Sequence, residues 1–185
     1  MKKSAFFLAA PLMISCTKER TQTPDQGVPV EGGRIVVNEL MATLSEEENE
    51  FGETADWFEL YNAGNAVELK SGQWFVTDDV DGNPRKFELP EVTIPAEGFL
   101  VIWCDGRGQK SSDIHTNFKL SPNDGSVAIV YAGGDAELDV SAAPISASPA
   151  ADISFGRAPD GTALWTTLSL PTPGAPNEAL TSPGN

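Results

Sequence analysis

Histidine and cysteine are scarce in this chain of 185 residues, which has one histidine, His115, and two cysteines, Cys16 and Cys104. Zinc sites take three or four nitrogen, sulfur or carboxylate ligands, so the sequence offers little material for one. A Ser-His-Asp triad would have to use His115, and no Gly-x-Ser-x-Gly nucleophile elbow occurs. We therefore expect a non-enzymatic protein without a tightly bound cofactor.

Positive charge is also scarce, because 12 Lys and Arg face 27 Asp and Glu and leave a net charge of -15. A field of this sign repels phosphate backbones and anionic lipid headgroups. The composition therefore argues against nucleic-acid binding and against membrane attachment through a basic patch. It favours cations and basic partners instead.

No apolar run is long enough to span a bilayer. Lys2 and Lys3 precede an apolar stretch over residues 5–14, which ends at Ser15 and Cys16. A membrane-spanning helix needs about 20 apolar residues, so this segment is typical of a secretory signal peptide over residues 1–15. A small residue directly before a cysteine resembles the bacterial lipobox, in which the cysteine is diacylated and becomes the mature N-terminus.

The resemblance implies that Cys16 carries a lipid and that the protein is anchored in the bacterial cell envelope, at the outer membrane or cell surface. Met13 and Ile14 depart from the usual Leu-(Ala/Ser) of this motif. A conventional signal peptide followed by a coincidental cysteine is the alternative. A lipid on Cys16 would leave Cys104 without a disulfide partner in an oxidising compartment.

The segments that flank the middle of the chain are rich in Pro, Gly, Thr and charge. Residues 16–32 have no periodic apolar pattern and are expected to form a flexible tether. Residues 178–185 have the same character and are expected to form a disordered tail. One domain is therefore expected over residues 33–177.

Helical periodicity is absent from this domain, and 17 Gly and 14 Pro punctuate the chain. Segments rich in Val, Ile, Phe, Trp and Tyr alternate with turn formers and predict short strands. These segments are residues 34–40, 56–62, 73–79, 86–89, 98–104, 117–120, 126–132 and 152–157. Several short strands in one domain of this size predict an all-β sandwich. In the second segment apolar residues occupy both faces, which indicates a strand covered on both sides; a sheet with an exposed aromatic patch is the alternative.

Several of these segments resemble, in order, the motifs of the lamin-tail domain, an immunoglobulin-like β-sandwich of nuclear lamins and secreted bacterial proteins. The resembling segments are residues 35–41 (IVVNELM), 56–62 (DWFELYN), 69–79, 94–101 (IPAEGFLV), 115–121 (HTNFKLS), 154–157 (SFGR) and 172–177 (TPGAPN). Ser71 and Gln73 stretch the family's Ser-Gly-Trp by one residue, and Cys104 stands where alanine is common.

The resemblance implies an interaction module, because no catalytic residues are recognised for this family. We therefore expect a binding or anchoring module for a protein or glycan partner at the cell envelope. In bacteria such domains are often appended to secreted nucleases and phosphatases. An accessory role in a calcium-dependent extracellular hydrolase system is therefore the alternative.

Residues 77–88 contain the spacing Asp-x-Asp-Gly-x5-Glu of an EF-hand calcium loop. Pro84, Arg85 and Lys86 are unfavourable inside such a loop, and both flanks are predicted strands. We expect a hairpin whose tip is residues 81–83. A weak calcium contact by Asp78, Asp79 and Asp81 is the alternative, because clustered carboxylates suit a hard cation.

The remaining candidates are polar groups inside apolar segments. Glu39, Asp56 and Glu59 must find hydrogen-bond donors or shift their pKa values, and we expect donors rather than a cation site. His115 is expected to make a structural hydrogen bond, and Cys104 to be an inert buried thiol. The acidic run over residues 45–50 is expected to be a solvated loop.

Overall fold

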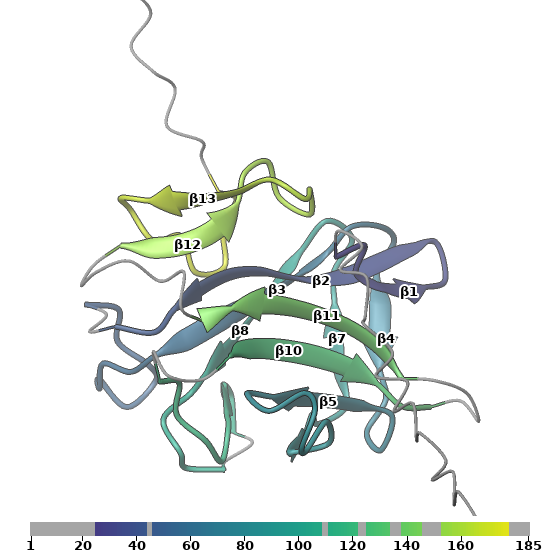
Figure 1. Ribbon diagram of the computed structural model, residues 1–185, viewed down its shortest axis with the longest axis horizontal. Coiled ribbons are helices and arrows are strands. Elements are labelled where there is room, and N and C mark those ends of the chain that lie inside the picture. The colour runs from purple at the N-terminus through teal and green to yellow at the C-terminus, as the bar shows by residue number, and fades with distance from the viewer. Residues whose placement is uncertain are drawn as a thin grey trace, which may run out of the picture.

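The computed structural model describes residues 25–43, 46–108, 111–121, 125–133, 138–145 and 153–177. In these ranges the chain forms strands and loops without an α-helix, and the strands make three sheets. The architecture is all-β and consistent with a β-sandwich, as the sequence predicts. In Figure 1, β10 and β11 lie side by side in one layer, and β2, β3 and β8 belong to the other layer.

The larger sheet has seven strands. Their order is β13 (Trp165–Leu168), β12 (Ser154–Arg157), β2 (Gly33–Met41), β3 (Trp57–Asn62), β8 (Phe99–Trp103) and β9 (Ile114–His115), with β1 (Val28–Val30) paired to β2. All pairings are antiparallel except that of β8 with β9. The short, parallel β9 therefore forms one end of this sheet.

A second sheet of four strands packs against the first. Its order is β11 (Asp139–Pro144), β10 (Ser126–Tyr131), β5 (Trp74–Thr77) and β6 (Phe87–Glu88). A separate pair consists of β4 (Val67–Leu69) and β7 (Val92–Ile94). A turn over residues 95–98 connects β7 directly to β8, so the β4–β7 pair is joined to the larger sheet at β8.

The strand β3 is buried on both faces, as its apolar residues predict. Phe58 and Leu60 point into the main core between the sheets, and both are fully buried. Trp57 packs on the opposite face in a smaller apolar cluster with Met41 and Trp103. Because both faces are covered, the polar Glu59 in the middle of this strand is also fully buried.

Two expectations about segments are wrong. Residues 117–120 are not a strand: Lys119 makes only an isolated bridge to Asp105, and Thr116 Oγ1 donates to the carbonyl of Phe118. Phe118 and Leu120 are nevertheless buried, so this loop supplies core side chains without pairing. The side-chain hydrogen bond competes with strand geometry here.

The end of the expected tether is also structured. Val28 to Val30 pair with β2, and the Asp25 carboxylate lies 2.6 Å from the guanidinium of Arg157. Alternation of Val28 and Val30 around a proline was too short a pattern to predict this strand. The domain therefore includes residues 25–32, while residues 1–24 and 178–185 lie outside the described ranges.

Candidate functional site

The single histidine lies at the end of the larger sheet, on β9, and is fully buried. Its Nδ1 lies 2.7 Å from Asp105 Oδ2, and its Nε2 lies 3.5 Å from Glu50 Oε1. Nε2 has no hydrogen-bond partner, and the Phe51 ring packs 5.2 Å from the imidazole. The imidazole is thus enclosed by two carboxylates and an aromatic ring.

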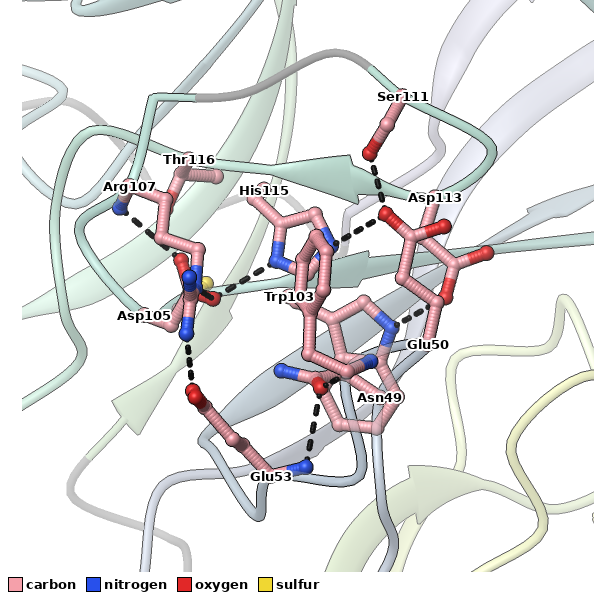
Figure 2. Close-up of polar contacts among 12 residues, drawn as sticks. Asn49, Glu50, Glu53, Trp103, Asp105, Arg107, Ser111, Asp113, His115 and Thr116 are labelled. Carbon is pink, nitrogen blue, oxygen red and sulfur yellow. Dashed lines mark hydrogen bonds and ion pairs between the residues drawn. The ribbon is translucent and has the colours of Figure 1, made fainter.

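The connection between β2 and β3 and the connection between β8 and β9 supply the groups around this imidazole (Figure 2). Asn49 Oδ1 accepts the backbone N–H groups of Phe51 and Glu53, which closes a tight turn. Arg107 joins that turn to the loop after β8 by contacting Glu53 and Asp105. We call the set of Asn49, Glu50, Glu53, Trp103, Asp105, Arg107, Ser111, Asp113 and His115 the His115 cluster.

Ser111 and His115 both contact Glu50 in the His115 cluster. The Ser111 hydroxyl donates to Glu50 rather than to His115, and the histidine Nε2 faces a carboxylate. Within the described ranges, no group of three or more His, Cys, Asp and Glu side chains is placed to hold a metal ion. His115 makes the hydrogen bond that the sequence predicts, with Asp105 as its partner.

A groove of about 650 Å³ runs beside the His115 cluster along β8. Its apolar part comes from Phe99, Leu100, Val101, Trp103 and Ile114, with Pro90 and Val92 opposite. The rest of its lining is Glu47, Glu48, Glu91, Ser111, Ser112, Asp113, Pro173 and Gly174. We call this the β8 groove. It combines an apolar floor with four acidic residues, and no lysine or arginine is among the described residues that line it.

Trp103 connects the cluster to the groove. Its indole Nε1 donates to Asp113 Oδ2 at 3.2 Å, and both residues line the groove. This hydrogen bond holds the ring against the wall of the groove and satisfies an indole donor that is otherwise buried. The network around His115 therefore positions the loops that shape the groove.

A smaller cavity of about 380 Å³ lies on the other side of the cluster, lined by residues of the 53–56 and 104–107 segments and by Lys119. Burial raises the pKa of Asp56 to about 6, and the charge of Lys119 opposes this shift. Cys104 is buried, and burial raises the pKa of its thiol well above the ordinary value. The inert thiol predicted for Cys104 agrees with this placement.

Glu39 and Glu59 face each other on neighbouring strands and are fully buried. Glu39 accepts hydrogen bonds from Ser154 and from the Thr172 hydroxyl and backbone N–H. Glu59 accepts from Asn38 at 3.3 Å and from the Gly174 N–H at 2.6 Å. These contacts confirm the expectation that Glu39 and Glu59 find donors. Burial still raises both pKa values, that of Glu59 to about 8. For Asp56, the third carboxylate of that expectation, the described contacts include no hydrogen-bond donor, and its pKa is shifted instead.

The three aspartates suggested for calcium lie in the connection between β5 and β6, as predicted. The Asp78 carboxylate pairs with Lys86 Nζ at 2.6 Å, and Asp79 Oδ1 accepts the Gly82 N–H at 2.9 Å. Asp81 is exposed at the turn. The loop is closed by its own hydrogen bonds, including one from Thr77 Oγ1 to the carbonyl of Asn83. The carboxylates of Asp78 and Asp79 are therefore already engaged within the loop.

Sequence reasoning missed most of the His115 cluster and all of the β8 groove. Glu50 is an exposed residue, as predicted for the acidic loop, but its side chain is only 18% exposed and one carboxylate oxygen faces His115. The one available signal was the buried histidine itself, which needs partners. Cys16 lies outside the described residues, and within the described ranges no helix has the length and apolarity to cross a bilayer.

Comparisons with protein-family models, with curated proteins and with solved structures give no match to this chain.

Proposed function

We propose that this protein is a non-catalytic lipoprotein of the bacterial cell envelope, anchored through Cys16, whose domain binds a protein or glycan partner. The β8 groove carries this proposal, because it is the larger of the two hollows described above and joins aromatic and apolar side chains to polar groups. Such a mixture is typical of sites that recognise another molecule. The lipid would hold the domain at a surface where partners are abundant.

We further infer that the sandwich is of the immunoglobulin-like, lamin-tail type. Three of the resembling segments are adjacent in the larger sheet, since β2, β3 and β8 pair in that order. The segment 115–121 supplies the buried His115, Thr116 and Phe118 beside β8. The closing segment 172–177 donates hydrogen bonds to Glu39 and Glu59 on β2 and β3. The motifs thus lie next to one another around the site.

The proposal is tested by exposing the full chain to separated protein and glycan fractions of the bacterial envelope. Retention of one fraction is expected, and Val101→Asp should weaken it at least tenfold, because a charge would enter the apolar floor of the groove. Ala175→Asp is the matched control, because Ala175 is exposed and outside the groove lining. Retention of neither fraction, or catalytic turnover of a retained component, would contradict the proposal.

A further inference from the structure

The backbone of β8 alternates between two directions that the hydrogen bonds identify. Cys104 N–H donates to Asp56 O at 2.7 Å, and Gly98 O accepts Asn62 N–H at 2.9 Å, so both residues turn toward β3. Backbone groups of alternate residues point to opposite sides of a strand, so Phe99, Val101 and Trp103 turn away from β3. Trp103 O agrees, because it accepts Thr116 N–H at 2.8 Å beyond the end of β9.

The edge of β8 that faces away from β3 is only partly covered by β9. The strand β9 pairs with Ile102 and Trp103, and no other described strand pairs with β8 on that side. The parallel register of Ile102 with Ile114 occupies the carbonyl of Val101, so the edge is open at Phe99 and at the N–H of Val101. Both residues also line the β8 groove. Natural proteins protect open edges with charges, prolines or bulges, and this stretch has none of these devices. An uncovered apolar edge inside a groove is suited to receive an added strand.

The charge around the open edge indicates what kind of strand would fit. Glu48 and Glu91 are exposed on the rim of the groove, and Glu47 and Asp113 complete its acidic lining. Lysine or arginine side chains on an incoming strand would meet these carboxylates, while apolar side chains at alternate positions would meet Phe99 and Val101. A second copy of this chain is a poor occupant, because each copy carries a net charge of -15.

We propose that the open edge of β8 binds a short, extended, basic segment of a partner protein by strand addition. The segment alternates basic and apolar residues and pairs its backbone with Phe99 and Val101, in line with β9. This inference rests on the proposed binding function and narrows the partner to a cationic polypeptide. Only a few residues of the edge are open, so side-chain ion pairs must supply much of the affinity.

The test uses the full chain and a panel of capped synthetic peptides of the form Lys-X-Lys-X-Lys, with X being Val, Leu, Phe or Tyr. At least one peptide is expected to slow amide exchange at Phe99 or Val101, as followed by nuclear magnetic resonance. The same peptide N-methylated on its pairing amides should bind at least tenfold more weakly, because it has lost its backbone donors. A peptide with Glu in place of Lys should not bind.

Two double variants test the charge argument. E48K/E91K reverses the charge of the groove rim and should weaken binding of the basic peptide at least tenfold. E31K/E68K makes the same charge change at exposed sites outside the groove and should weaken binding much less.

Failure of every peptide to bind up to about 1 mM, or equal binding after N-methylation, would overturn strand addition. If envelope glycan, rather than a basic peptide, perturbs Phe99, Val101 and Trp103, this inference fails while the proposed binding function stands. If the chain retains neither envelope fraction, the binding function itself fails.

Discussion

Glu59 is a single residue whose protonation should make the stability of this domain depend on pH. Its carboxylate is fully buried in the middle of β3, opposite Glu39, and its hydrogen-bond donors are neutral N–H groups. Burial raises its pKa to about 8, and the neighbouring Glu39 carboxylate adds to the shift. The protonated form of Glu59 is therefore the one that the folded structure accommodates best.

The free energy of unfolding is expected to fall as pH rises from about 4.5 to about 8, since Glu59 keeps its proton in the folded chain after the unfolded chain has released it. Each unit of pKa difference corresponds to about 1.4 kcal/mol, so the loss should reach a few kcal/mol. Glu59→Gln mimics the neutral acid and should flatten this slope in urea unfolding experiments, leaving the smaller contributions of Glu39 and Asp56. Glu68→Gln, at an exposed glutamate on β4, should keep the wild-type slope. An unchanged slope in Glu59→Gln would show that Glu59 does not hold the proton.

At the residue scale, the sequence predicted which groups need partners and left the identity of those partners open. The positions of Glu39, Glu59 and His115 inside apolar segments indicated that each must be satisfied. The partners come from distant loops: Thr172 for Glu39, Gly174 for Glu59, and Glu50 facing His115. Only tertiary packing brings these loops together, so no local pattern could have identified the His115 cluster.

Among the elements, β1 and the segment that leads into it from Asp25 contribute more to the domain than their length suggests. Asp25 accepts hydrogen bonds from Ser141 and Ala142 on β11 and pairs with Arg157 on β12, so it ties these two strands together. The Arg157 side chain is only 1% exposed. Its guanidinium also donates to the carbonyl of Val37, which fixes it beneath the end of β12.

Replacing Asp25 with alanine should therefore destabilise the domain by about 3 to 5 kcal/mol, since it leaves a buried guanidinium without its carboxylate. Chemical denaturation of the full chain measures this loss. Glu31→Ala, in the exposed turn between β1 and β2, is the control and should change stability by less than about 0.5 kcal/mol. If the two variants are equally stable, residues 25–32 act as the tether that the sequence suggested.

The hairpin between β5 and β6 should bind calcium weakly. Tight calcium sites need about six to eight oxygens, whereas Asp78 is paired with Lys86 and Asp79 accepts a backbone N–H of its own turn. We expect a dissociation constant weaker than about 1 mM, and less than about 1 kcal/mol of stabilisation at about 1 mM calcium. Calorimetric titration of the wild type and of an Asp79→Asn, Asp81→Asn variant checks this. A stoichiometric micromolar site that disappears in the variant would favour the calcium-dependent hydrolase alternative.

The sequence predicted the strands that are rich in large side chains, and most of the strands that it missed are short. The segments that became β2, β3, β5, β6, β8, β10 and β12 are rich in β-branched and aromatic residues. The missed strands β1, β4 and β7 have three residues each, β9 has two, and β13 has four. In β11, the sequence DVSAAP has little β propensity, and its pairing with β10 and packing against β2 determine its conformation. The open edge of β8 depends on where the parallel strand β9 begins, so no local pattern predicted it.

On the scale of the whole molecule, charge and the proposed lipid act in opposite directions at a membrane. Removal of residues 1–15 would take away Lys2 and Lys3 and no acidic residue, which would change the net charge from -15 to -17. Anionic headgroups would repel such a domain. Stable anchoring would then depend on acyl chains, each methylene of which contributes about 0.8 kcal/mol when it enters the bilayer.

The full chain expressed in a bacterium is therefore expected to sediment with membranes, and Cys16→Ser is expected to move it to the soluble fraction. The effect should be nearly complete, because a diacylated cysteine supplies two chains and the acidic domain supplies no compensating attraction. Cys104→Ala is the matched control, since Cys104 is a buried thiol and its loss should leave the protein with the membrane. Mass spectrometry of the membrane-bound protein should find acylated Cys16 at the mature N-terminus. Membrane retention of the Cys16→Ser chain, or an unmodified Cys16 inside a soluble wild-type product, would contradict the lipid anchor and leave a conventional secretory signal as the explanation of residues 1–15.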